Sequence, residues 1–136
     1  MDRNIQLLGI AKKAGLLAVG GDDVSAAARN GKAWLIISAS DASGGTLRRA
    51  RINAEQGNSL CVTVPYSKIE LGSVTRRGSP ATVAFLDVGL AAGFMKGLAE
   101  TEPQRYSDAA DFLAEKARAL AKRKKHTPSG KMRTAQ

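Results

Sequence analysis

The stretch GGDDVSAAARNGKAWLII, residues 20–37, predicts a helix followed directly by a buried strand. The glycines at 20–21 form a turn, two aspartates occupy the first turn of the helix, and Gly31 ends it. Trp34 to Ile37 is apolar at every position, which is typical of a central strand with both faces covered. This unit indicates an α/β fold.

The same alternation of helix and strand extends in both directions from this unit. The first helix is expected to be capped by Asp2 or Asn4 and to end at Gly15. A capping box, Ser67 to Glu70, begins another helix. The remaining expected elements up to residue 98 are three strands, at 17–19, 60–64 and 81–86, and two helices. One is a basic helix that opens with residues 43–46 and is closed by Gly57, and the other spans 89–98. We therefore predict a three-layer α/β/α sandwich with a mixed central sheet as one domain, residues 1–100.

A second unit, residues 101–136, is expected to be an amphipathic basic helix with a flexible tail. The boundary is placed at residues 101–103, and Ser107 is expected to cap the helix. One apolar face at helical spacing can dock on the domain; it comprises Tyr106, Ala110, Leu113, Ala117 and Leu120.

The positive charge is concentrated at the C-terminal end. The chain has 136 residues and a formal net charge of +9, and 8 lysines and arginines with no acidic residue lie in residues 116–136. Clustered cations favour a polyanionic partner, because binding releases the counterions condensed on phosphates. A merely solubilising tail is the alternative. The longest apolar runs fit a strand, not the roughly 20 residues of a membrane span, so no membrane partner is expected.

The residue inventory argues against catalysis. The chain has one histidine, His126, and one cysteine, Cys61, so neither a His-based nucleophilic site nor a Cys/His zinc site is expected. Asp22 and Asp23 are better explained by the helix dipole than by a metal. The chain is therefore expected to be a non-enzyme without cofactor or metal, in the reducing cytoplasm.

Three segments resemble the kink-turn-binding ribosomal protein superfamily (the L-seven-Ae type). They are GGDDVSAAARNGKAWLIISASDAS at 20–43, VPYSKIELG at 64–72 and ATVAFLDVGLAAGF at 81–94. The opening LLGIAKKAGLLAVG, residues 7–20, is similar to the bacterial YlxQ-like branch. The resemblance covers roughly residues 4–98. It implies a monomer that binds a kinked RNA helix with tandem sheared guanine–adenine pairs.

In that family, a Gly-x-Asn-Glu-x-x-Lys motif at the start of the second helix contacts the sheared pairs. Here Gly20 matches the glycine, Asp22 stands at the asparagine, Asp23 at the glutamate and Ala26 at the lysine. The substitutions remove an amide donor and a cation and add a negative charge near phosphate. We therefore expect this chain to bind a kink-turn more weakly than a protein with the complete family motif does.

The resemblance implies a second contact surface in the loop between the fourth helix and the last strand. Here that loop reads Arg76-Arg77-Gly78-Ser79, which favours pairing with phosphate and arginine stacking on a base. The candidate RNA-binding residues are Lys12, Lys13, Gly20, Gly21, Asp22, Asp23, Lys32, Arg76, Arg77, Gly78, Ser79, Lys122, Arg123, Lys124 and Lys125.

The functional prediction is a non-catalytic RNA-binding accessory protein of ribosome assembly or translation, with structured RNA and the ribosome as partners. Two alternatives stay open. One is a protein-interaction module on the same fold that has lost specific RNA recognition, which the two aspartates and Ala26 favour. The other is a nucleotide-binding enzyme at Gly20-Gly21, although the Walker and Gly-x-Gly-x-x-Gly spacings are absent.

Overall fold

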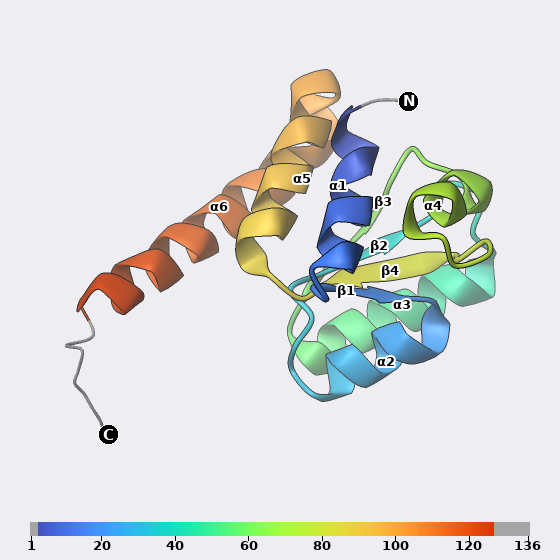
Figure 1. The fold of residues 1–136 in the computed structure, drawn as a ribbon, viewed down its shortest axis with the longest axis horizontal. Coiled ribbons are helices and arrows are strands. Elements are labelled where there is room, and N and C mark those ends of the chain that lie inside the picture. The colour runs from blue at the N-terminus through green and yellow to red at the C-terminus, as the bar shows by residue number, and fades with distance from the viewer. Residues whose placement is uncertain (1–2, 127–136) are drawn as a thin grey trace.

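The computed structural model describes residues 3–126, and of 124–126 only the backbone. Helices and strands alternate in that range up to α5, and a sixth helix follows α5 directly (Figure 1). In chain order they are α1 (Arg3–Lys13), β1 (Leu17–Val19), α2 (Gly21–Arg29), β2 (Leu35–Ser38), α3 (Gly44–Gly57), β3 (Leu60–Thr63), α4 (Lys68–Thr75), β4 (Thr82–Phe85), α5 (Val88–Thr101) and α6 (Pro103–His126).

The four strands form one mixed sheet in the order β1-β4-β2-β3. Strand β4 is antiparallel to both β1 and β2, whereas β2 and β3 are parallel. Parallel neighbours need a crossover, and α3 provides it. The predicted mixed sheet is therefore confirmed.

Helices cover both faces of this sheet, which confirms the three-layer sandwich. Alternate residues of β2 face different layers: Leu35 and Ile37 join the core under α1, α4, α5 and α6, while Ile36 joins the core under α2 and α3. All three side chains are completely buried. The apolar run that predicted a central strand is therefore explained, as expected, by burial on both faces of the sheet.

The start of α6 differs from the prediction. The helix begins at Pro103, and Ser107 lies within it, so the predicted cap at Ser107 is wrong. Proline suits the first helical position, because its ring fixes φ and its missing N–H has no partner there. The carbonyl of Glu102 accepts hydrogen bonds from the backbone N–H groups of Arg105 and Tyr106, both at 3.1 Å.

The N-terminal cap also differs. Asn4 lies inside α1, and its side-chain amide donates a 2.9 Å hydrogen bond to the carbonyl of Phe94 in α5. The alternative cap, Asp2, lies outside the described residues. Asn4 therefore joins two helices that are far apart in the sequence.

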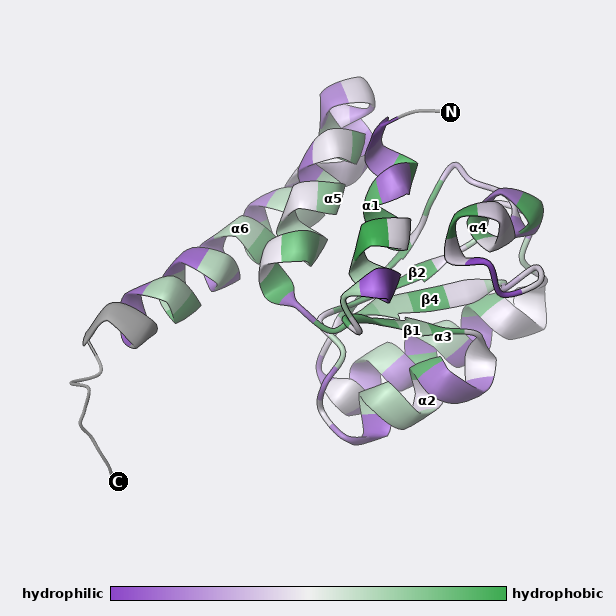
Figure 2. Cartoon of the chain, in the orientation of Figure 1, coloured by the Kyte–Doolittle hydropathy of each residue, from purple (hydrophilic) through white to green (hydrophobic). Residues whose placement is uncertain are grey.

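The first half of α6 is part of the main core. Tyr106, Ala110 and Leu113 are buried there, and the Tyr106 hydroxyl donates a 3.0 Å hydrogen bond to the carbonyl of Thr63 in β3. The docking face expected from the sequence is thus confirmed. Beyond it α6 extends past the rest of the molecule (Figure 1), and hydrophobic and hydrophilic bands alternate along its length (Figure 2). Within residues 3–126, no helix combines the length and apolar character needed to cross a membrane.

Candidate nucleic-acid interface

The backbone at the start of α2 is fixed by Gly20. Its φ of 95° and ψ of 158° lie in a region that only glycine adopts readily. Its N–H donates to the carbonyl of Thr82 at 2.9 Å, which attaches the turn to β4. No side chain caps α2, so the first N–H groups of the helix point outward from Gly21, Asp22 and Asp23. Such a helix end favours an anion.

Two ion pairs connect the first turn of α2 to other elements. A carboxylate oxygen of Asp23 lies 3.6 Å from the guanidinium of Arg77, and one of Asp22 lies 3.6 Å from that of Arg49 in α3. All four side chains are more than half exposed. Pairs this exposed contribute little stability, so a phosphate can compete for the arginines. Sequence reasoning missed Arg49, although it lies in the predicted basic helix.

The α4–β4 loop is held in shape by its backbone. Arg76 takes a left-handed conformation with φ of 58°, and its N–H donates to the carbonyl of Gly72 at 2.7 Å. A Cβ on Gly72 would overlap the carbonyl of Gly78, so the loop folds tightly over the end of α4. Arg77 and Ser79 are exposed on this loop. The predicted loop therefore has one defined backbone path.

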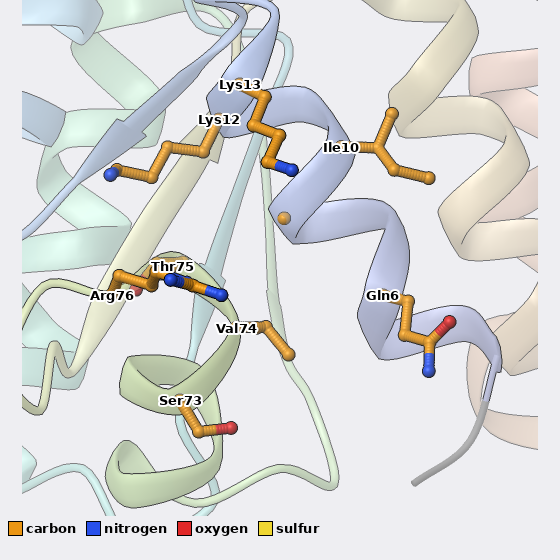
Figure 3. Close-up of a pocket in the computed structure, with 9 residues that line it drawn as sticks. Gln6, Ile10, Lys12, Lys13, Ser73, Val74, Thr75 and Arg76 are labelled. Atoms are coloured by element: carbon orange, nitrogen blue, oxygen red, sulfur yellow. The ribbon is translucent and has the colours of Figure 1, made fainter.

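A groove of about 490 Å³ lies between α1 and α4, next to this loop. Lys12 and Lys13 reach it from the last turn of α1, and Arg76 reaches it from the end of α4 (Figure 3). Its wall includes Val74 and the 56% exposed Ile10. Among the described residues that line it, none is acidic. The groove combines apolar surface with three cations, a combination that suits a nucleic-acid backbone with an adjoining base.

Other predicted site residues lie elsewhere. Lys32 follows Gly31 at the far end of α2, and a helix of 9 residues is about 13 Å long, so it does not join the Gly20–Asp23 end. Lys122 and Arg123 belong to α6, on the opposite side of the molecule from α4 (Figure 1). The side chains of Lys124 and Lys125 lie outside the described part.

Among the described residues, the one cysteine is not activated as a nucleophile. Burial raises the pKa of the Cys61 thiol, and the positive charge of nearby Arg51 lowers it by less. A nucleophilic cysteine needs the opposite shift. In the part of the chain that the structure describes, no three His, Cys, Asp or Glu side chains are grouped so as to hold a metal ion.

Solved structures share this arrangement of layers. A protein of unknown function from Bacillus halodurans superposes with a TM-score of 0.62 at 23% identity, covering 69% of this chain and 94% of that one. The 15.5kD RNA binding protein of Giardia lamblia superposes with a TM-score of 0.57 at 19% identity, covering 66% of this chain and 79% of that one. No family model matches the sequence, and no curated protein does. These likenesses establish the fold.

Proposed function

We propose that this chain is a non-catalytic RNA-binding protein of the kink-turn-binding ribosomal protein superfamily, in its YlxQ-like branch. We further propose that it acts as a monomeric, cytoplasmic accessory factor of ribosome assembly or translation. The observation that carries the proposal is the meeting of Arg77 with Asp23. It joins the two segments, remote in sequence, at which the family resemblance puts its RNA contacts. The fold shared with the Giardia lamblia RNA binding protein supports the same assignment.

Each part of the interface has a distinct role in this proposal. The N–H groups at the start of α2 bind a phosphate, and Asp23 accepts hydrogen bonds from guanine N–H groups. Arg77 exchanges its carboxylate partner for phosphate. Lys12 and Arg76, at the α1–α4 groove, bind phosphates of the RNA strand beyond its kink. Affinity should therefore depend on phosphates more than on base sequence.

The proposal is tested by binding of the full chain to a kink-turn RNA, a matched straight duplex and a single strand at two salt concentrations. We expect the kink-turn to bind best, with a log–log salt slope of about −4 to −5 for about six phosphate contacts. Replacing Arg76 and Arg77 with alanine should flatten that slope by about 2. Lys96→Ala, which removes an exposed cation on α5, is the matched control and should change little.

Two results would contradict the proposal. A slope near zero would exclude a phosphate-dominated interface. A Lys96→Ala effect about half that of the paired arginine variant, that is, equal for each cation removed, would show that net charge, not this site, determines binding.

The rival function is a protein-interaction module on this fold. It is favoured by Asp22 and Asp23, because their carboxylates already pair with Arg49 and Arg77 and thus reduce the positive charge that these arginines offer to a phosphate. It predicts no binding to any of the three RNAs even at low salt. Binding of an acidic protein through the C-terminal cations would then be the expected activity.

A further inference from the structure

A second groove shares no lining residue with the α1–α4 groove. It has a volume of about 370 Å³ and runs between α6 and the segments that follow α2 and α3. We propose that this groove is a separate RNA-binding site that takes a short single-stranded segment, stacking a base on Phe112 and pairing phosphates with Lys116 and Arg123. The proposal extends the proposed function but uses none of the residues of that interface.

The first observation is an aromatic side chain that the core does not use. Tyr106, Ala110 and Leu113 form the buried face of α6, and Phe112 lies off that face with 48% of its surface exposed. The Lys116 ammonium lies 5.4 Å from the centre of the Phe112 ring. A ring and a cation held together on the surface match the way proteins bind single strands without sequence preference.

The second observation is the charge of the groove. Lys116 and Arg123 line its α6 side, and Lys32, between lining residues 31 and 33, is exposed beside it. None of the described lining residues is acidic. The opposite side holds the carbonyl ends of α2 and α3, at Gly31 and Gly57, whose partial charge is negative. Phosphates are therefore expected along α6, with the N–H groups of a base directed toward the helix ends.

The chemistry favours a single strand over a duplex or an acidic peptide. A duplex hides the faces of its bases, so it could use the cations but not Phe112. Aspartate and glutamate side chains likewise have no flat ring to stack on Phe112 or on Trp34, which also lines the groove. The unpaired base of an RNA strand uses both kinds of contact.

Helix α3 separates the two sites. Arg49, which pairs with Asp22, lies in the first half of α3. Asn58, the residue directly after α3, lines the second groove. The nine residues from Arg49 to Asn58 rise about 13 Å along the helix axis. Both sites can therefore be occupied at once, and one protein could join a structured RNA element to a neighbouring unpaired strand.

The only tryptophan of the chain, Trp34, reports on this groove directly. Titrating the full-length protein with a short oligouridylate, which forms no duplex with itself, should quench Trp34 fluorescence. Phe112→Ala should weaken this binding by about tenfold, the effect of removing one base-stacking ring. Ile52→Ala, which removes a 46% exposed side chain on α3 away from the groove, is the control and should bind like the wild type.

Three results would overturn the proposal. One is oligouridylate binding that Phe112→Ala leaves unchanged. Another is complete displacement of oligouridylate by saturating kink-turn RNA, which would place both ligands in one site. The third is equal quenching by an acidic peptide, which would make the groove a protein-docking site.

The outcomes also separate this inference from the proposed function. If replacing Arg76 and Arg77 weakens kink-turn binding while Phe112→Ala leaves oligouridylate binding unchanged, only this inference fails. If oligouridylate binding depends on Phe112 while no kinked RNA binds, only the proposed function fails.

Discussion

The guanidinium of Arg77 lies 3.6 Å from the carboxylate of Asp23, and both side chains remain more than half exposed. This contact joins the α4–β4 loop to the first turn of α2 across more than fifty residues of sequence. It also neutralises a carboxylate that would otherwise repel phosphate. Because exposed ion pairs are weak, the arginine is held in position without being committed to one partner.

Restoring the family motif at the start of α2 should strengthen kink-turn binding. Asp22→Asn removes a negative charge and Ala26→Lys adds a cation one turn further along the same helix. We expect a tighter kink-turn complex whose salt slope is steeper by about 1, because the lysine adds one phosphate contact. Fluorescence anisotropy with a labelled kink-turn and a straight duplex measures both. Unchanged kink-turn affinity would indicate that another surface binds the RNA.

Gly72 should be intolerant of any side chain. An added Cβ would overlap the Gly78 carbonyl, so Gly72→Ala should displace the α4–β4 loop and destabilise the fold by about 1–3 kcal/mol. Gly93→Ala is the control, since nothing lies within 4 Å of its Cβ position on α5. It should be neutral or stabilising by up to about 1 kcal/mol. Urea denaturation distinguishes the two, and equal stability of both variants would contradict the tight loop.

The hydrogen bond that joins α6 to the sheet can be tested by Tyr106→Phe. The ring keeps its packing, but the 3.0 Å bond to the Thr63 carbonyl is lost, for an expected loss of about 1 kcal/mol. Tyr106→Ala removes the packing as well and should cost several times more, about 3–5 kcal/mol. Equal stability of Tyr106→Phe and the wild type would show that water replaces the bond.

Stability should fall in alkaline solution through Cys61. Burial raises the pKa of this thiol in the folded state, so the unfolded chain loses its proton at a lower pH. Above the usual thiol pKa of about 8.5, the folded state binds more protons, and the free energy of unfolding decreases as pH rises. Denaturation at about pH 7.5 and about pH 9.5 should show this loss, and Cys61→Ala should reduce it. An identical loss in that variant would assign the effect to other groups.

Much of the fold could be predicted because local signals agree with the tertiary structure. The apolar run in β2 reflects burial on two faces, and the Ser67–Glu70 capping box is present with both of its hydrogen bonds. The cap at Ser107 failed for a physical reason. Serine is a good cap by type, but Pro103 had already set the start of the helix, four residues earlier.

The arrangement of the site could be predicted only in part. Helix order indicated that the start of α2 and the α4–β4 loop are the relevant segments. The pairing of Arg49 with Asp22, and the meeting of Lys12 with Arg76 at one groove, depend on how helices pack. No local pattern encodes such distances. The helical spacing already left Phe112 off the predicted docking face, but its place in a groove beside Trp34 also depends on helix packing.

The anchoring of α6 has a consequence for avidity. Its first half is fixed in the core, and its 24 residues form one helix about 36 Å long. The described cations of its second half, Lys116, Arg118, Lys122 and Arg123, therefore lie at a set distance from α2, as on a rigid spacer. Once an RNA is bound at α2, the effective concentration of its second contact, with α6, depends on whether the spacing of its two binding elements matches that distance. RNAs of equal charge but different internal spacing should consequently differ in affinity.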